Sequence, residues 1–165
     1  MSATSLCRQC ALALDMGTSG LKALLVDCHG RVVAEARTPT PLHAPSGVSP
    51  LAREMHPARV LQAVGKVSQA VLAQGRGAQV AVVAITSMRQ GIALLDRHGQ
   101  EIYLGPNIDL RGVFEGSALD ETHSHAIYHT TGHLPTFFFP WSRLLWLKTH
   151  QPRAYERGAV LLPIA

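Results

Sequence analysis

A glycine-rich turn between two apolar segments holds the residues of this sequence best suited to chemistry. It reads Asp-Met-Gly-Thr-Ser-Gly-Leu-Lys from Asp15 to Lys22. Glycine allows a tight backbone, so the N–H groups of Gly17–Gly20 and the hydroxyls of Thr18 and Ser19 can donate to phosphate oxygens. The pattern therefore predicts a turn that cradles phosphate.

Two charged residues frame this turn. Asp15 can hold a Mg²⁺ ion through water, and Lys22 can add positive charge beside a phosphate. An ordinary hairpin built from turn-favoured residues is the alternative. Because the glycines lie between strand-like segments and do not open a helix, the motif is neither a P-loop nor a dinucleotide-binding motif.

The elements that must position the turn follow from hydrophobic periodicity. Seven segments have the apolar pattern of strands: 11–15, 21–27, 31–37, 80–86, 92–96, 101–104 and 159–164. The first three predict an antiparallel start to a sheet. The run 80–86 is rich in β-branched residues, which is typical of a strand buried on both faces. A hairpin over 92–104 gives the sheet mixed strand directions.

Three segments predict helices. Pro57 suits the first turn of a helix, and apolar residues at helical spacing follow it as far as Gly75. Segments 113–126 and 141–150 are helical in pattern too, whereas the proline-rich stretch 38–50 predicts a surface loop. We therefore expect an α/β fold, a mixed sheet with flanking helices.

Composition limits the partners. The chain has 165 residues, 47% of them hydrophobic, which suits one domain with one core. The net charge is +4, but only 16% of residues are charged and the basic ones are scattered, so no nucleic-acid partner is expected. No apolar run approaches the roughly 20 residues that cross a bilayer, and no signal peptide is evident. We expect no membrane partner and a cytoplasmic protein.

Cysteine, histidine and aromatic patterns predict packing or solvated roles. Cys7 and Cys10 have metal-ligand spacing but no second pair, and reduced thiols are expected. The four histidines between 123 and 133 lack a regular ligand pattern. The aromatic run 137–141 is expected to pack in the core, with sugar stacking as the alternative, and Trp146 is expected in the core.

Several ordered motifs resemble the FGGY carbohydrate kinases, within the actin-like ATPase superfamily. Ala13–Asp27 is similar to that family's first phosphate motif, and Glu54–Pro57 to its Glu-x-Asp-Pro helix entry, with His56 in place of the usual Asp. Ile85–Gly91 and Arg143–Lys148 resemble later signatures. The resemblance covers residues 11–165 after a tail at 1–10. It implies a truncated, ribonuclease H-like N-terminal domain without the C-terminal ATPase domain.

The resemblance also implies substrate-binding residues. The family's substrate contacts correspond here to Arg89, Gln90, Asn107, Asp109 and Arg111. A polyol needs paired donors and acceptors, and a buried site discriminates sharply when its polar groups would otherwise stay unpaired. The alternative for Asp109 is an internal salt bridge with Arg111 or Arg89 that braces a loop, and both roles are compatible.

One branch of the family is most similar in motif. The combination of Ser87–Gly91, Asn107–Arg111 and the Arg143 helix resembles the autoinducer-2 kinase branch, whose substrate is a five-carbon dihydroxydione. Xylulokinase-like members come next. Asn107 stands where many xylulose and glycerol kinases have Trp, which argues against those substrates, and Gln90 replaces the Glu common in the branch.

The implied activity is ATP-dependent phosphorylation of a hydroxyl group on a small sugar, polyol or autoinducer-2-like substrate, with Mg²⁺ and with Asp15 positioning metal and phosphate. The expected general base and the adenosine motifs are absent from these residues, so we expect the chain alone to be inactive, and a full-length form to be a possible homodimer. The alternatives are a truncated, non-catalytic sugar-binding or interaction module and an actin-like ATPase. The apolar segment 159–164 at the end of the sequence favours truncation.

Overall fold

The computed structural model describes residues 9–134 and 136–164. The strands and helices, in chain order, are β1 Gln9–Met16, β2 Gly20–Asp27, β3 Val32–Pro39, β4 Leu42–His43, β5 Glu54–Met55, α2 Pro57–Gln74, β6 Gln79–Ser87, β7 Ile92–Leu95, β8 Glu101–Gly105, α3 Val113–Thr131, α4 Pro140–His150, α5 Pro152–Arg157 and β9 Val160–Pro163. The chain divides into two compact units. The first holds β1, β2, β3, α2 and β6, and the second holds the other elements.

A four-stranded sheet in the order β3-β2-β1-β6 organises the first unit. Strands β1, β2 and β3 pair antiparallel, and β6 runs parallel to β1. The register places Leu14 opposite Ala23 and Asp15 opposite Lys22. The predicted antiparallel start and the mixed strand directions are confirmed.

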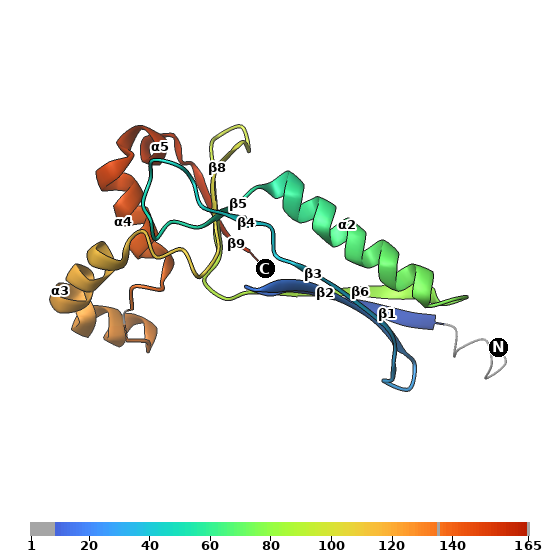
Figure 1. Ribbon diagram of the computed structural model, residues 1–165. Coiled ribbons are helices and arrows are strands. Elements are labelled where there is room, and N and C mark those ends of the chain that lie inside the picture. Colours follow the sequence, from blue (N-terminus) through green and yellow to red (C-terminus); the bar gives the residue numbers. More distant parts are fainter. Residues whose placement is uncertain (1–8, 135, 165) are drawn as a thin grey trace. The chain divides into compact units, whose positions relative to one another are not determined.

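Helix α2 covers the antiparallel part of this sheet and packs on β2 and β3 (Figure 1). Pro57 begins the helix, and Val67 and Val71 are its buried side chains. The core that they complete consists of Cys10, Leu12, Leu14, Ala23, Leu25, Ala34, Val67 and Val71. The helix ends at the predicted place, where the Gly75 N–H donates to the Val71 carbonyl at 3.0 Å.

Strand β6 corrects one prediction. The run 80–86 was expected to be buried on both faces, but every residue from Gln79 to Thr86 is exposed. Val82, Val83 and Ile85 have exposed fractions of 56%, 52% and 62%. The reason is that β6 is the edge strand and pairs with β1, while helix α2, which covers the sheet, packs on β2 and β3. Its β-branched composition correctly predicted a strand.

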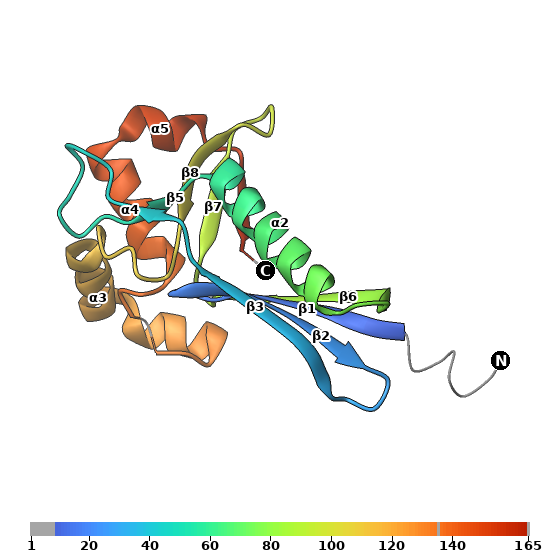
Figure 2. The same cartoon turned by 45° about the vertical axis from the view of Figure 1, so that its right-hand side comes forward.

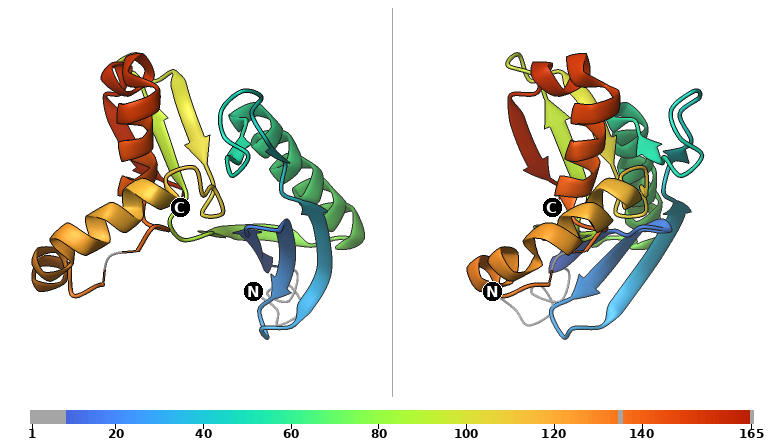
Figure 3. Two further views of the ribbon diagram at one scale, coloured as in Figure 1. Left: turned by 60° about the vertical axis from the view of Figure 1, so that its left-hand side comes forward. Right: turned by 90° about the vertical axis from the view of Figure 1, so that its left-hand side faces the viewer.

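A three-stranded sheet in the order β8-β7-β9 organises the second unit, and all its pairs are antiparallel (Figure 3). Ile92, Leu94 and Tyr103 from the strands pack with Trp146 and Leu147 of α4. Helices α3 and α4 also contact each other. They approach closely at Gly116 of α3, where an added Cβ atom would lie 2.9 Å from the Cβ atom of Ser142 in α4 and 2.7 Å from the Cα atom of Phe137 just before it.

Several elements of the second unit are longer than predicted or were not predicted. The hairpin β7–β8 and strand β9 are confirmed, and α3 runs five residues beyond the predicted end at 126, to Thr131. Helix α5 and the two-residue pair β4–β5 were missed, because short elements carry too little periodicity. Figure 2 shows α3, α4 and α5 following one another along the chain. Among the described residues, no helix is long and apolar enough to cross a membrane.

The two hairpin turns at Asp27 and Asp96 share one chemistry. In each, the aspartate Oδ1 accepts backbone N–H groups two and four residues later, and a glycine with φ of 78° or 75° completes the turn. These backbone hydrogen bonds lower the pKa of both carboxyl groups. Their similarity therefore reflects turn chemistry and not an internal repeat.

The exposed edge strand gives a first prediction. Val82→Lys should leave the fold intact, because the side chain is 56% exposed, and should reduce self-association, because a charge on an edge strand discourages strand pairing. Sedimentation velocity of wild type and variant would measure the effect. Leu25→Lys, at a position that is 0% exposed, is the matched control and should unfold the chain. Equal self-association of wild type and Val82→Lys would contradict the prediction.

Candidate functional site

The predicted phosphate turn joins β1 to β2 in the first unit. The Gly17 N–H donates to the Gly20 carbonyl at 3.0 Å, which closes the turn. Thr40 braces it from the end of β3, because its hydroxyl donates to the Gly17 carbonyl at 2.7 Å and its N–H to the Ser19 carbonyl at 3.4 Å. Thr40 is buried, and sequence reasoning missed it because its partners lie more than 20 residues away.

Close backbone approach favours glycine at both positions. A Cβ atom on Gly17 would lie 3.0 Å from the Gly20 carbonyl oxygen, and one on Gly20 would lie 3.2 Å from the Thr38 carbonyl oxygen. The Gly17 N–H was expected to donate to phosphate, but in this conformation it is engaged within the turn. Gly17 instead contributes room for the close backbone approach. Thr18, Ser19 and Gly20 form the tip of the turn.

A pocket of about 440 Å³ opens beside the turn. Its lining residues are Asp15, Gly17, Ser19, Gly20, Leu21, Lys22, Arg37, Thr38 and Pro39. Lys22 and Arg37 both pair with Glu35, at 3.3 Å and 2.8 Å, and hydrogen bonds from Arg37 and Lys22 lower the pKa of that carboxyl group. Asp15 is exposed at this pocket. The residues that line the pocket thus suit an anion beside Lys22 and Arg37 and a cation beside Asp15.

The second group of predicted residues surrounds one buried carboxylate in the second unit. Asp109 is 1% exposed, and its Oδ2 accepts from the Tyr103 hydroxyl at 2.5 Å and from Arg111 Nε at 2.8 Å. Its Oδ1 accepts the backbone N–H groups of Arg53 and Arg111, each at 3.2 Å. Arg111, 3% exposed, also donates to Glu54 at 2.5 Å. The internal ion pair considered for Asp109 and Arg111 is therefore present.

Burial sets the charge states of this network. Desolvation, and then the charge of Asp109, raise the pKa of Tyr103 well above its usual value, so the phenol stays protonated and donates. Burial acts to lower the pKa of Arg111, but Asp109 and its other partners raise it overall. The Arg111 guanidinium also lies 4.8 Å from the ring centroid of Tyr103 and 5.1 Å from that of Trp146.

Glycine makes room for the network at the end of β8. A Cβ atom on Gly105 would overlap the Tyr103 side chain, at 1.6 Å from its hydroxyl oxygen. The Tyr103 side chain therefore lies along its own strand, next to Gly105, and its hydroxyl reaches Asp109. A larger residue at 105 would have to displace the hydroxyl from the carboxylate.

Arg143 connects the two segments that carry the predicted acceptor-binding residues. It is 1% exposed, and its guanidinium donates to the Pro106 carbonyl at 2.5 Å and to the Gln90 carbonyl. Gln90 has a φ of 64°, the one positive value among the described non-glycine residues. Burial lowers the pKa of Arg143. We find that this residue, in sequence only part of a helix signature, fixes the backbone next to Arg89 and Asn107.

The remaining predicted residues are accessible. Arg89 is exposed and forms no ion pair with any residue in the described ranges, while Gln90 and Asn107 are half-buried. Arg89 is thus open to solvent and Gln90 and Asn107 are partly so, whereas Asp109 and Arg111 are enclosed. The prediction of substrate contact treated all five as equivalent, because a sequence motif does not distinguish exposed from enclosed side chains.

The aromatic run lies at the surface of the second unit. The rings of Phe137 and Phe138 contact each other in a tilted arrangement with centroids 4.3 Å apart, and those of Phe139 and Trp141 do so with centroids 4.7 Å apart. Phe138 is 44% exposed, whereas Phe137, Phe139 and Trp141 are half-buried, so the run is only partly enclosed. Trp146, at 7%, is in the core as predicted.

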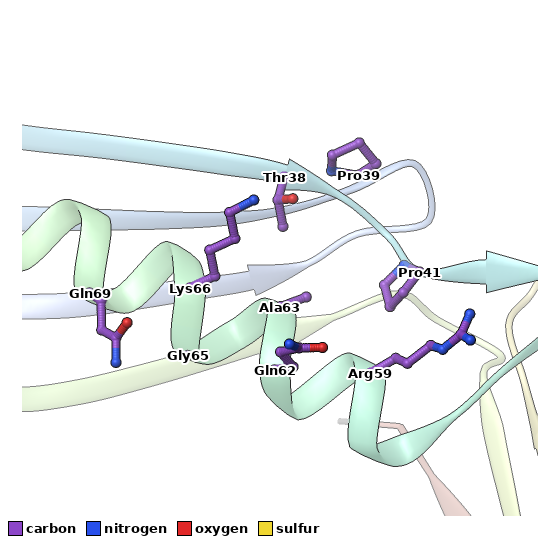
Figure 4. Close-up of a pocket in the computed structure, with 9 residues that line it drawn as sticks. All are labelled: Thr38, Pro39, Pro41, Arg59, Gln62, Ala63, Gly65, Lys66 and Gln69. Carbon is purple, nitrogen blue, oxygen red and sulfur yellow. The ribbon is translucent and has the colours of Figure 1, made fainter.

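A second hollow of about 700 Å³ lies between α2 and β3 in the first unit (Figure 4). Arg59, Gln62, Lys66 and Gln69 line it from the helix, and Lys66 extends toward the strand that carries Thr38 (Figure 4). Their spacing of three or four residues puts them on one helix face. All four are exposed, so the hollow is a solvated basic groove.

Comparisons with known proteins agree with these motifs. The model of the N-terminal domain of the FGGY family of carbohydrate kinases matches residues 10–164. An autoinducer-2 kinase of Photorhabdus laumondii is 32% identical over 161 residues, which cover 93% of this chain and 30% of that protein. The chain thus spans about three tenths of the length of the curated relatives it matches.

Solved structures have the same fold. A xylulose kinase from Rhodospirillum rubrum is 26% identical with a TM-score of 0.80, over 92% of this chain and 32% of that one. A glycerol kinase from Plasmodium falciparum, solved with ADP, has a TM-score of 0.77 at 17% identity, over 93% of this chain and 32% of that one. The expected fold class, the N-terminal domain of an actin-like ATPase fold, is confirmed.

The buried network gives a second prediction. Asp109→Asn should lower the free energy of unfolding by about 3–5 kcal/mol, because the buried Arg111 would lose one of its two anionic partners and keep only Glu54. Tyr103→Phe removes a single donor to the carboxylate and should cost less, about 1.5–3 kcal/mol. Urea unfolding followed by circular dichroism measures both. Equal midpoints for wild type and Asp109→Asn would show that the carboxylate does not hold this unit together.

The Arg143 clamp gives a third prediction. Arg143→Met should raise amide hydrogen exchange at residues 88–92 and 105–107 by about tenfold or more, because both segments lose a restraining hydrogen bond. Exchange measured by mass spectrometry tests this. Arg153→Met, at an exposed position of α5, is the control and should leave those segments unchanged. Unaltered exchange in the Arg143 variant would contradict the clamp.

Proposed function

Since the chain belongs to the FGGY family of carbohydrate kinases, we propose that it supplies the phosphate-binding turn and the acceptor-binding residues for ATP-dependent phosphorylation of a small sugar, polyol or autoinducer-2-like dihydroxydione. The observation that carries the proposal is the accessible trio Arg89, Gln90 and Asn107, fixed on a buried scaffold in a chain whose family phosphorylates carbohydrates.

The first unit is suited to phosphate. The residues for ATP are Gly17, Thr18, Ser19, Gly20 and Lys22, and a Mg²⁺ ion would be held by Asp15 through water. This fits an exposed carboxylate and a lysine lining one pocket beside a tight turn. When bound, ATP supplies the phosphoryl group and Mg²⁺ supplies neutralising charge. The chain's own turn contributes a backbone whose shape Thr40 fixes.

The second unit is suited to a hydroxylated acceptor. Arg89 offers a guanidinium with several N–H donors, and the amides of Gln90 and Asn107 can both donate and accept. An acceptor with adjacent hydroxyl or carbonyl groups matches such a set. We propose that Asp109 and Arg111 act on the acceptor by fixing the loop that carries Asn107, since both are enclosed and bonded to each other.

A dihydroxydione is the acceptor class that we favour. The support is the 32% identity with an autoinducer-2 kinase and an asparagine at 107, where many xylulose and glycerol kinases have an indole. A small amide leaves more room and adds hydrogen-bonding capacity. Gln90 in place of a carboxylate offers an amide donor to the acceptor as well.

A fourth prediction tests the proposed function in a chimera. Residues 10–164 would replace the matching segment of the P. laumondii autoinducer-2 kinase, because the 165-residue chain alone should show no turnover in a coupled ATP-consumption assay. The chimera should phosphorylate the dihydroxydione. Asp15→Asn should lower kcat on the order of 10²-fold through loss of charge positioning, and Arg89→Ala should raise KM about tenfold, equivalent to about 1.4 kcal/mol of binding.

The control is Arg76→Ala, an exposed residue outside both sets, which should leave both constants unchanged. Turnover by the isolated chain would disprove the expectation that it is incomplete. A folded chimera that phosphorylates none of a panel of ketoses, polyols and the dihydroxydione would count against the kinase proposal itself.

A further inference from the structure

Two histidines face each other on the exposed surface of helix α3. His125 and His129 lie four residues apart, and their Nε2 atoms are 3.2 Å from each other. Their ring centroids are 4.3 Å apart, with the ring planes tilted by 47°. Both side chains are exposed to solvent. The sequence contains nine histidines, and helical spacing singles out this pair because residues four apart lie on the same face.

The separation of the two Nε2 atoms suits a shared metal ion. With metal–nitrogen bonds of about 2.0–2.1 Å, two nitrogens 3.2 Å apart subtend an angle of about 100° at the metal. That angle lies between the octahedral and tetrahedral values. A direct hydrogen bond requires one ring to hold its proton on Nε2 and the other on Nδ1, whereas a metal ion accepts the lone pairs of both Nε2 atoms.

We propose that His125 and His129 form a two-histidine site for a divalent transition metal of the imidazole-preferring class, with Cu²⁺ bound most tightly and Ni²⁺ and Zn²⁺ less tightly. Imidazole favours these ions, and Cu²⁺ stands highest in the general order of affinities. Mg²⁺ and Ca²⁺ prefer oxygen ligands, so this site is distinct in chemistry from Asp15.

Coordination at the site is open. No group of three or more histidine, cysteine, aspartate or glutamate side chains gathers to hold a metal within residues 9–134 and 136–164. Water or an external ligand must therefore fill the remaining positions. An open, two-ligand site binds more weakly than a closed structural one, and it takes metal from solution without rearrangement of the chain.

Metal binding should also stabilise the helix. The two rings come from successive turns near the C-terminal end of α3, which stops at Gly132 with a φ of 71°. A metal that joins the rings favours the helical state, in which they are close, over the unfolded state, in which they are not. Binding affinity and the metal-dependent rise in thermal stability are thus two linked readouts of one site.

The experiment uses the tag-free 165-residue chain with CuCl₂ and NiCl₂ as probes. Isothermal titration should give one equivalent of Cu²⁺ on the wild type, at least tenfold tighter than on His125→Ala/His129→Ala. Electron paramagnetic resonance should show nitrogen ligation that disappears in this double variant. Both histidines are exposed, so the double variant should keep the circular dichroism spectrum of wild type.

His123→Ala is the matched control on the same helix, because His123 is exposed and its Nδ1 contacts the Thr122 hydroxyl rather than another histidine. It should retain wild-type affinity and the metal-dependent rise in melting temperature. The cysteines are unchanged in every variant, so binding by thiols contributes equally to all. Equal Cu²⁺ affinity of wild type and the double variant, or equal loss in His123→Ala, would overturn the proposal.

Discussion

The buried carboxylate of Asp109 is the constraint on which the second unit depends. A charge with 1% exposure is tolerated only when its oxygens are fully bonded, and this one accepts from a phenol, a guanidinium and two backbone N–H groups. Those donors come from the loop before β5, from strand β8 and from the loop after β8. The Asp109 side chain therefore bonds to segments on both sides of Asn107. Gly105 has no Cβ atom and so leaves room for the Tyr103 hydroxyl to reach the Asp109 carboxylate.

A second buried charge extends this constraint to the rest of the proposed acceptor site. Arg143 has no carboxylate partner among the residues that the structure describes, and its two terminal nitrogens donate to backbone carbonyls, one of which belongs to a residue held at positive φ. Backbone strain of this kind persists only where surrounding contacts enforce it, and it concentrates at functional sites. The exposed Arg89 and the half-buried Gln90 are thus presented from a backbone fixed by buried polar contacts, while the phosphate turn is held by its own Gly17–Gly20 hydrogen bond and by Thr40.

Much of the fold could be predicted from periodicity, because β1–β3, α2 and α4 each have a face that the unit buries. Prediction failed for β6, where an apolar composition indicates a strand but says nothing about what covers it. The residues of the site could be named from motif resemblance. Their division into accessible and enclosed sets could not, because the contacts of Thr40 and Arg143 span 21 to 53 residues of sequence. The contact between His125 and His129 requires α3 to continue past residue 126, which the sequence pattern did not indicate.

The most direct measurement is a two-dimensional NMR titration of the ¹⁵N-labelled chain, first with the dihydroxydione or a pentulose and then with ATP and Mg²⁺. The acceptor should shift the amide signals of Arg89, Gln90 and Asn107 in a saturable way and leave the turn at residues 15–22 unchanged. ATP with Mg²⁺ should then shift that turn. Acceptor shifts confined to other residues, or absent at millimolar sugar while the turn still responds to ATP, would contradict the assignment of this chain as the acceptor-binding part of a carbohydrate kinase.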